Sequence, residues 1–398
     1  MPSWKKTLYA AWVAQIFSII GFSFVLPFLP LYIGTLGVSD ARAMARWAGI
    51  ASAAMAATMA VFAPLWGLLA DRFGRKSMVL RSMIGGTVVL AAMGFCQNVW
   101  QLVICRMLQG ALTGTVAASQ ALVAGTTPRE RCGYALGMMQ GAVFLGNSVG
   151  PLIGGLLADT LGYRAAFLGA SVMLFCGTIL VACAVEEGPL PEREAEYAGR
   201  GGYGRVLAVG GFLAAACALF MVRFANTAAA PVFPLLVKEI SGRQEGINAL
   251  TGVILFSSSL AATVSAGLFG KLSDTWGHRR LLIVSSLSAG ALATLYVMAQ
   301  SVAHLFALRV MFGFAAAGMM PSANAIIRGL TPDRDIGKAF GAATAISTIG
   351  MALGPLVGGY LGASALGLRA PFVLTGLVLI LGAALVLWRI KPAYVTAS

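Results

Sequence analysis

The chain has 398 residues, of which 59% are hydrophobic and only 11% are charged. A soluble protein of average composition carries about 25% charged residues, so this composition excludes an ordinary water-soluble protein and favours a polytopic membrane protein. The formal net charge of +14 is interpreted as a cytoplasmic loop bias and not as a sign of nucleic-acid binding.

Apolar runs of bilayer length, read in chain order, predict about twelve transmembrane helices. Their approximate ranges are 8–35, 47–70, 77–96, 99–123, 133–158, 163–185, 206–236, 247–272, 280–299, 302–328, 337–364 and 369–389. The glutamate-rich gap at 186–205 predicts a cytoplasmic linker between a bundle at 1–185 and a second bundle at 206–398. Lys and Arg gather in the loops that lie on the same side of the membrane as the N-terminus. Because positively charged loops stay in the cytoplasm, we expect both termini there.

The second half of the sequence repeats the first at an offset of about 203 residues. Gly67–Lys76 returns as Gly270–Arg279, Arg106 with Gly110 returns as Arg309 with Gly313, and Gly150-Pro151 returns as Gly354-Pro355. Repeats in the same orientation are related by an axis along the membrane normal. The pattern predicts an all-α fold of two pseudo-symmetric six-helix bundles with an alternating-access site between them.

Charged residues at the end of the second predicted helix suggest a conformational latch. Asp71 is unfavourable near a helix C-terminus, which carries partial negative charge, and it therefore needs a cationic partner or the N-terminus of another helix. A topogenic role would explain the cations here, but not the recurrence of the carboxylate and the glycines. The candidate latch residues are Gly67, Asp71, Arg72, Gly74, Arg75 and Lys76 and, in the repeat, Gly270, Asp274 and Gly277.

The fifth predicted helix has a face of small residues. Gly146, Gly150 and Gly154 recur at every fourth position, which permits close helix packing, and Pro151 removes one backbone donor and bends the helix. This face, with Gly155 beside it, is either a hinge or bundle interface or a site of close packing without a mechanistic role.

Three of these motifs resemble those of the major facilitator superfamily. GLLADRFGRK resembles motif A, LVICRMLQGALTG resembles motif B, and GNSVGPLIGG resembles motif C, which is typical of drug:proton antiporters. The resemblance covers the whole chain and is closest to the bacterial multidrug efflux group with twelve spans. It implies that Asp71 latches the bundles in the outward-open state and that Arg106, with Gln109 and Gly110, takes part in proton coupling.

Polar residues inside the spans mark a candidate substrate cavity. Charge within the hydrocarbon is costly, so such residues normally face a cavity or a partner. In the superfamily, spans one, four, seven and ten line the central cavity, and Arg106 lies in span four. Snorkelling or bonding to loop carbonyls is the alternative for Arg106 and Arg309, since both lie near span ends. The other candidates are Gln15, Ser18, Thr113, Arg223, Asn226, Arg309 and Asn324.

The acidic residues all fall at predicted span ends or in loops. A cavity with arginines and no carboxylate favours anionic, zwitterionic or neutral amphiphiles over strongly cationic ones. Proton coupling could run through Asp71 or Asp159, could use the ionisation of the substrate, or could be absent.

No catalytic motif is found in the sequence, so we expect a transporter and not an enzyme. The predicted function is proton-driven export of amphiphilic small molecules. The alternatives are a carrier for an organic anion or lipid-like metabolite, which need not be coupled to protons, and a ligand sensor that does not transport. We expect a monomer in the bacterial inner membrane that binds lipid, substrate and protons, with no nucleic acid, metal or cofactor.

Overall fold

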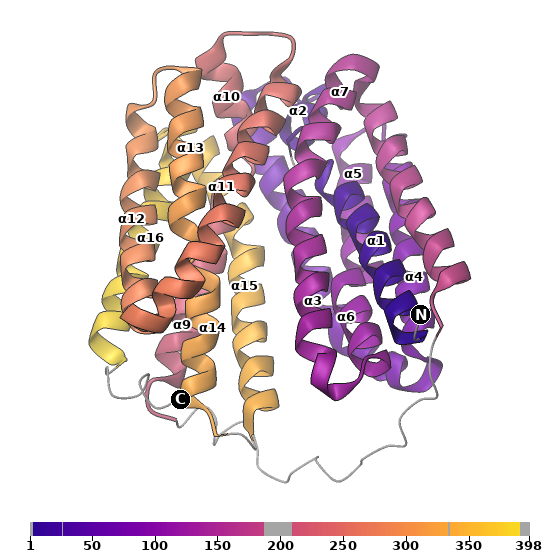
Figure 1. The fold of residues 1–398 in the computed structure, drawn as a ribbon. Helices are drawn as coiled ribbons and strands as arrows, with labels where there is room; N and C mark the ends of the chain where they lie inside the picture. Colours follow the sequence, from indigo (N-terminus) through magenta and orange to yellow (C-terminus); the bar gives the residue numbers. More distant parts are fainter. Residues whose placement is uncertain (1–2, 26, 187–208, 333–334, 391–398) are drawn as a thin grey trace. The chain divides into compact units, whose positions relative to one another are not determined.

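The computed structural model describes residues 3–25, 27–186, 209–332 and 335–390 (Figure 1). Within these ranges the regular elements are α-helices and short 3₁₀ turns, without a strand, which confirms the all-α prediction. Ten helical segments of the described chain are long and apolar enough to cross a membrane. One of them, α7 (Cys132–Ala184), leaves the helical conformation at Gly162 and so carries both predicted spans 133–158 and 163–185.

Several of the other spans are continuous helices. They are α3 (Ala41–Phe73), α4 (Arg75–Met93), α11 (Ile247–Trp276), α12 (His278–Leu295), α15 (Ile336–Ala363) and α16 (Ala370–Arg389); the 3₁₀ turns are η1 (Arg129–Arg131) and η3 (Tyr296–Met298). Gly74 and Gly277, which separate α3 from α4 and α11 from α12, have φ values of 89° and 81°. Only glycine adopts this conformation at little cost, which explains why both glycines recur in the repeat.

The first, fourth, seventh and tenth predicted spans are each broken into two helices. The pairs are α1 (Ser3–Ser23) and α2 (Leu29–Thr35), α5 (Val99–Leu112) and α6 (Thr115–Thr126), α9 (Phe212–Ala228) and α10 (Phe233–Ser241), and α13 (Val302–Ala316) and α14 (Met319–Leu330). Pro30 and Pro234 stand in the first turns of α2 and α10, where a proline's missing N–H costs least. The breaks fall at corresponding places in the two halves, so they belong to the repeat.

The chain divides into two compact units. Unit 1 comprises residues 1–39, 54–197 and 243–256, and unit 2 comprises 40–53, 198–242 and 257–398. The division therefore follows the two halves of the sequence, except that the start of α3 belongs to unit 2 and the start of α11 belongs to unit 1. The predicted linker 186–205 lies outside the described residues, apart from Glu186.

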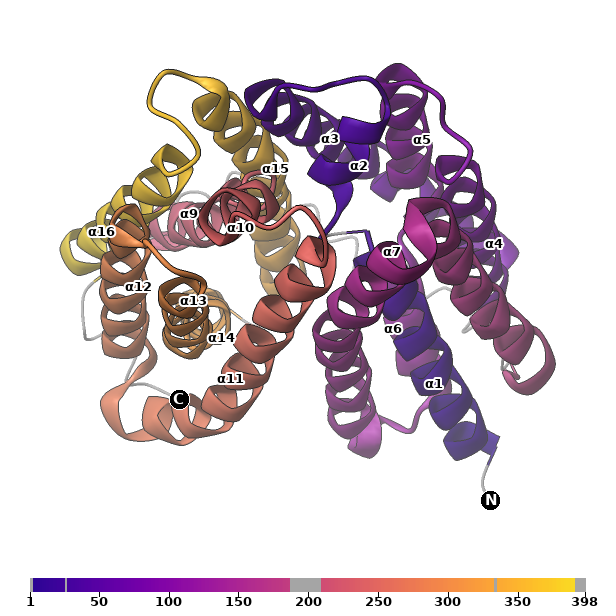
Figure 2. The same cartoon turned by 90° about the horizontal axis from the view of Figure 1, so that it is seen from above.

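Each unit has its own apolar core. In unit 1, α1 runs beside α7 (Figure 1), and Val79, Met83 and Val181 form a buried cluster between α4 and α7. In unit 2, α9 lies between α15 and α16 (Figure 2), with Phe212 and Leu379 buried in the core. In a membrane such interiors are stabilised mainly by close packing, because the lipid tails are as apolar as the core.

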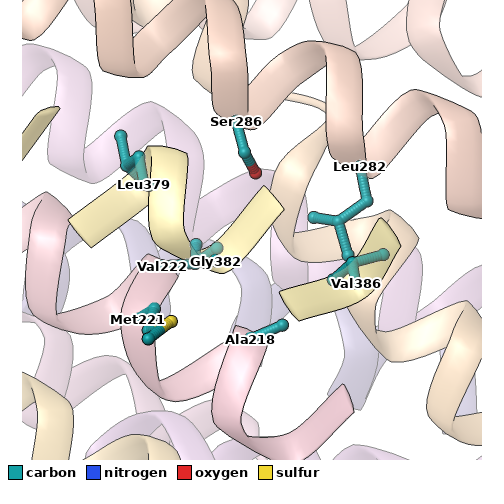
Figure 3. A pocket seen from close by; sticks show the side chains of 8 residues that line it. All are labelled: Ala218, Met221, Val222, Leu282, Ser286, Leu379, Gly382 and Val386. Carbon is teal, nitrogen blue, oxygen red and sulfur yellow. The ribbon is translucent and has the colours of Figure 1, made fainter. Parts of the chain in front are cut away.

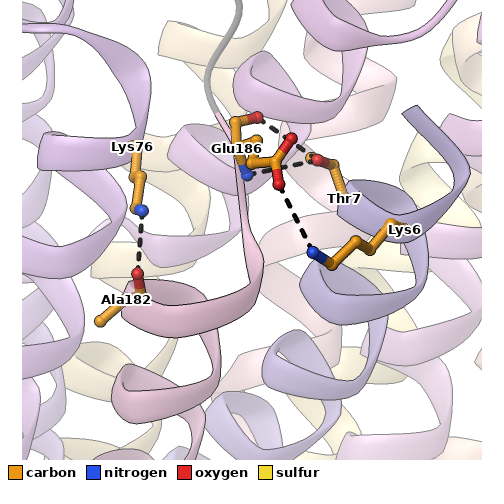
Figure 4. Close-up of polar contacts among 5 residues, drawn as sticks. All are labelled: Lys6, Thr7, Lys76, Ala182 and Glu186. Atoms are coloured by element: carbon orange, nitrogen blue, oxygen red, sulfur yellow. Dashed lines mark hydrogen bonds and ion pairs between the residues drawn. The ribbon is translucent and has the colours of Figure 1, made fainter. Parts of the chain in front are cut away.

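In each half, a cation near the start of the third span binds the end of the last helix. The cation lies on α4 and binds α7 in the first half, and it lies on α12 and binds α16 in the second half. Lys76 donates from Nζ to the carbonyl oxygen of Ala182 at 2.9 Å, as Figure 4 shows. In the repeat, Arg279 donates from Nε to the carbonyl of Ile390 at 2.5 Å and from Nη2 to that of Leu387 at 2.8 Å. These carbonyls lack helical partners and carry partial negative charge, so a cation stabilises them.

The end of α7 is also tied to the start of α1 in unit 1. Glu186 pairs with Lys6 at 3.4 Å, and its carbonyl accepts a hydrogen bond from the Thr7 hydroxyl at 3.3 Å (Figure 4). Both members of the ion pair are well exposed, so this pair contributes little to stability.

Candidate functional site

Arg106, Gln109 and Thr113 form a buried polar face on α5. The exposed fractions of Arg106 and Gln109 are 5% and 1%. Arg106 Nη1 donates to Gln109 Oε1 at 2.9 Å and contacts Met55 Sδ at 3.4 Å, while its Nε is buried without a partner in the described chain. A buried charge that keeps one donor unsatisfied is expensive, which marks this face as a site for water or ligand.

Helix α3 holds α5 in place at this face. The hydroxyl of Thr58 donates to the carbonyl of Met107 at 2.9 Å, and a Cβ built on Gly110 would collide with the backbone of Met55. Gly110 is therefore required for close packing of α3 on α5, which adds a structural role to the proton-coupling role that the resemblance implies. The repeat uses the same device, because Gly313 packs on the carbonyl of Ser258 and the Ser258 hydroxyl donates to the carbonyl of Arg309 at 2.9 Å.

The break between α5 and α6 lies directly after the polar face. Gly114 has φ 124°, which ends the helical ladder. The carbonyl of Ala111 accepts a hydrogen bond from Trp66 Nε1 at 2.6 Å, and the Thr113 hydroxyl donates to the carbonyl of Gln109 at 2.6 Å. Non-helical backbone at membrane depth is tolerated where it is buried in protein or lines a water-filled cavity, and here Trp66 of unit 1 supplies a partner for the carbonyl of Ala111.

Gln15 and Ser18 on α1 are the other predicted cavity residues of unit 1. They are 1% and 0% exposed, and neither the amide atoms of Gln15 nor the hydroxyl of Ser18 has a hydrogen-bond partner among the described residues. Leaving such groups unsatisfied costs roughly 1–3 kcal/mol each. Unit 1 therefore contains several buried polar atoms that water or a polar ligand could satisfy.

Arg309 in unit 2 lies among aromatic rings. Its guanidinium carbon is 5.0 Å from the ring centroid of Phe233 and 5.7 Å from that of Phe312. These cation–π contacts stabilise the charge inside unit 2, so the side chain has a structural environment that the sequence did not reveal.

The remaining predicted cavity residues of unit 2 are more accessible. Arg223 and Asn226 lie one helical turn apart on α9 and are exposed, and Asn324 on α14 is partly buried. Asn226 Nδ2 donates to the carbonyl of Val222 at 2.9 Å, whereas the Arg223 guanidinium has no partner in the part of the chain described. Arg223 is thus a charge of unit 2 available to a ligand.

The small-residue face of α7 packs on α1. A Cβ built on Gly146 would lie 2.6 Å from Ile19 Cβ, and one on Gly154 would lie 2.5 Å from the carbonyl oxygen of Phe24. The Ser23 hydroxyl donates to the carbonyl of Gly146 at 2.9 Å. In the repeat, glycines of α15 pack on α9 in the same way, the Cβ of Gly350 meeting the carbonyl oxygen of Phe220 at 2.5 Å. These glycines are required for helix contact within each unit.

Further glycines of the same helices face the starts of α11 and α3. In unit 1, Gly155 of α7 packs on the backbone of Asn248, and in unit 2 a Cβ on Gly359 of α15 would lie 2.6 Å from the carbonyl oxygen of Ala45. Two neighbouring glycines of motif C, Gly154 and Gly155, therefore serve two different contacts.

The predicted latch residues lie at the ends of α3 and α11 and in the turns that follow. Arg72 stands 5.5 Å from the ring centroid of Phe73, and Arg75 Nη1 donates to the carbonyl of Ala121 at 3.0 Å. Apart from the backbone of its own helix, no atom of the described residues lies within 4 Å of a Cβ built on Gly67 or Gly270. The side chains of Asp71 and Asp274 lie outside the description, so the latch itself stays a prediction.

Asp159 joins α7 to the start of α11 within unit 1. Its Oδ1 accepts from Asn248 Nδ2 at 2.6 Å and from Asn248 N at 3.4 Å, and its Oδ2 accepts from Ala249 N at 2.6 Å. Tyr163 lies beside them, with its hydroxyl 3.4 Å from Asn248 Nδ2. A carboxylate that accepts the first N–H groups of a helix acts as a cap and favours the helix dipole. Asp159 therefore caps α11 from another helix.

Asp159→Asn is expected to loosen the start of α11. An amide cannot replace both carboxylate acceptors, and loss of a cap costs about 0.5–2 kcal/mol, so hydrogen exchange across residues 243–256 should accelerate roughly two- to thirtyfold. Asp40→Asn is the matched control, because Asp40 caps only its own helix through Ala43 N at 3.0 Å. Equal exchange of this segment in the wild type and Asp159→Asn would refute the capping role.

The small gap in Figure 3 is not a ligand site. It lies between α9, α12 and α16 and is lined mainly by apolar side chains such as Val222, Leu282 and Val386, with no room for a water molecule. No cluster of three His, Cys, Asp or Glu residues that could hold a metal ion occurs in the described ranges.

Sequence reasoning missed two features of the site. The helix breaks had a signal in Pro30, Pro234 and Gly114, but a bilayer-length hydropathy window averages over such residues. Asp159 stood out only as a possible proton carrier, since its partners lie 89 and 90 residues further along the chain.

Comparison with known proteins identifies relatives over nearly the full chain. The family model described as Major Facilitator Superfamily matches twice, at residues 11–215 and 215–397, once for each half. The chain is 32% identical to the multidrug resistance protein MdtG of Rahnella sp. over 98% of this chain and 94% of that protein. It is 31% identical to the multi-drug resistance efflux pump PmrA of Streptococcus pneumoniae over 94% of each.

A solved structure supports the same fold. A bacterial homologue of the human lysosomal transporter Spinster, crystallised in an inward-facing and unoccupied conformation, superposes with a TM-score of 0.82 at 16% identity. The match covers 98% of this chain and 99% of that one. At this identity the similarity concerns the fold alone.

Proposed function

Since the chain belongs to the Major Facilitator Superfamily and is a membrane transporter, not an enzyme, we propose a direction and a driving force for its transport. The protein exports amphiphilic small molecules in exchange for protons. The observation that carries this proposal is the match to relatives named for multidrug resistance and efflux over at least 94% of the chain. The resemblance of the sequence motifs to the superfamily is confirmed by the family match.

The geometry supports a transport site in the broken spans. The polar face of Arg106, Gln109 and Thr113 borders the break between α5 and α6, and Gln15 and Ser18 add buried polar atoms that lack partners in the described residues. Discontinuous helices with polar side chains are typical of the substrate sites of secondary transporters. Alternating access would expose such groups to each side of the membrane in turn.

Asp159 and Asp71 are the candidate carboxylates for proton exchange. Protonation of Asp159 would turn one of the two oxygens that cap α11 into a hydroxyl and weaken the cap, and this would couple a proton to the position of that helix. Asp71 keeps its proposed role as a latch in the outward-open state. The proposal includes a monomer in a bacterial inner membrane with both termini in the cytoplasm, driven by the proton gradient without a cofactor.

Transport of an organic anion is the second candidate. It is favoured by Arg106 in unit 1 and by Arg223 and Arg309 in unit 2, since arginines inside the predicted spans attract anionic substrates. The two candidates differ in the charge of the substrate and in proton coupling.

Proteoliposomes with a trapped pH dye would test both candidates. Lipophilic cations, neutral amphiphiles and organic anions are added in turn under an imposed pH gradient, and substrate flux and proton flux are recorded together. Proton movement triggered by a cation or a neutral amphiphile supports antiport of drugs. Anion flux without proton movement supports the carrier, and binding without flux would contradict both and leave a sensor.

Arg223→Ala is expected to weaken transport of anions more than that of neutral amphiphiles. Removing an accessible charge from the site should cost an anionic substrate roughly tenfold in apparent affinity, because a hydrogen bond to a charged group contributes about 1.5–3 kcal/mol. Arg223→Lys retains the charge and serves as the matched control. An equal loss for both substrate classes would show that Arg223 does not contact the substrate.

A further inference from the structure

A groove with a cavity volume of about 470 Å³ lies at one end of unit 2, outside the transport site. It is formed where the turn from α11 to α12 meets the last turn of α16. Its lining residues are Trp276, Arg279, Arg280, Ile283, Val284 and Leu387. None of these residues belongs to the candidate transport site.

The two arginines of the groove have different roles. Arg279 is engaged by the carbonyls of Leu387 and Ile390 at the end of α16. Arg280 is exposed, and its guanidinium has no partner in the described chain. In the first half of the sequence Lys76 corresponds to Arg279 and makes the equivalent contact, whereas Ser77 corresponds to Arg280. The fold therefore needs the first cation and not the second.

The groove is formed at the ends of helices that qualify as membrane spans, and from this we infer that it lies at the level of the lipid headgroups. Arg280 is in the first turn of α12 and Leu387 in the last turn of α16, and both helices have the length and hydropathy of membrane spans. Ile283 and Val284 follow one turn deeper, and Trp276, Val284 and Leu387 are 49%, 48% and 54% exposed. Tryptophan is enriched at this depth, and apolar side chains exposed below it face acyl chains.

We propose that this groove binds an anionic phospholipid. The lipid phosphate lies at Arg280, Trp276 packs against the glycerol region, and the first part of an acyl chain follows Ile283, Val284 and Leu387. Charge complementarity selects this occupant, because the lining side chains that the structure describes include two cations and no Asp or Glu and each Arg near a membrane surface attracts anionic lipid. The proposal does not depend on which substrate the protein transports.

Quenching of Trp276 by brominated lipid would test the site in the full-length protein. The chain is reconstituted in phosphatidylcholine vesicles with a minor fraction of phosphatidylglycerol, and bromine is placed on the acyl chains of either lipid at equal mole fraction. The difference in quenching between a protein and its Trp276→Phe counterpart reports Trp276 alone. We expect phosphatidylglycerol to quench Trp276 more strongly than phosphatidylcholine does.

Arg280→Gln should remove this preference for phosphatidylglycerol. We expect the preference in the wild type to be roughly fivefold, because one Arg near a membrane surface attracts anionic lipid by about that factor. Lys271→Gln is the matched control, because Lys271 is exposed near the same end of α11 but does not line the groove. Arg280 makes no hydrogen bond in the described chain, so the thermal unfolding of Arg280→Gln should match that of the wild type. Arg280→Lys keeps the charge and should keep the preference.

Three results would overturn the proposal. The first is equal quenching of Trp276 by the two lipids in the wild type. The second is an equal effect of Arg280→Gln and Lys271→Gln. The third is loss of the preference in excess inorganic phosphate, which would assign the groove to a soluble anion.

Discussion

Arg106→Ala is expected to lower transport by at least tenfold while leaving the protein inserted in the membrane. The substitution removes the buried guanidinium and leaves Gln109 Oε1 without its donor at 2.9 Å. A hydrogen bond to a charged group contributes about 1.5–3 kcal/mol, which corresponds to a change of roughly ten- to 150-fold. Substrate-driven flux into proteoliposomes, normalised to the amount of folded protein, measures the effect.

Thr58→Val separates a functional role of Arg106 from a structural one. Thr58 also binds α5, through the carbonyl of Met107 at 2.9 Å, but it carries no charge. If Arg106 acts on protons or substrate, Arg106→Ala loses transport and Thr58→Val keeps most of it. Equal losses in the two variants would mean that Arg106 only holds α5 against α3. Arg106→Lys keeps the charge but not the fork that reaches Gln109 and Met55, and it should recover part of the transport.

The helices of this protein could be predicted from sequence because bilayer length and hydropathy are local properties. The spans, the repeat and the all-α fold follow from runs of apolar residues and from motifs that recur. Gly74 and Gly277 recur in the two halves of the sequence, which indicated that glycine is required there but not why. The structure gives the reason, because both residues have a positive φ. The breaks in four spans were not predicted, because a proline or glycine inside a long apolar run does not by itself end a transmembrane helix.

The candidate site could be predicted only in part, because burial and pairing depend on residues distant in sequence. Arg106 and Arg223 were both expected to line a cavity, but the structure buries Arg106, at 5% exposure, and leaves Arg223 exposed on α9. The aromatic contacts of Arg309 with Phe233 and the cap that Asp159 provides for α11 link residues 76 or more positions apart. No local pattern in the sequence encodes such contacts.

Gly154→Val is expected to abolish most transport and to reduce the yield of folded protein. A Cβ at this position would lie 2.5 Å from the carbonyl oxygen and 2.6 Å from the Cα of Phe24. Both are backbone atoms, so relief requires α1 and α7 to separate and not merely a change of rotamer. Overpacking costs about 1–3 kcal/mol even where side chains can shift, and the net stability of a protein is only about 5–15 kcal/mol.

Gly141→Val provides the matched control on the same helix. Gly141 lies 13 positions before Gly154 in α7, and apart from the backbone of α7 no described atom lies within 4 Å of a Cβ built on it. The two variants carry the same change in helix propensity, so a difference between them in thermal unfolding and in flux measures the contact with α1 alone. If both variants fold and transport equally well, the small-residue face is not an interface. If Gly154→Val folds normally but fails to transport, the cycle itself requires close approach of α1 and α7, and motif C then acts in transport and not only as a packing surface.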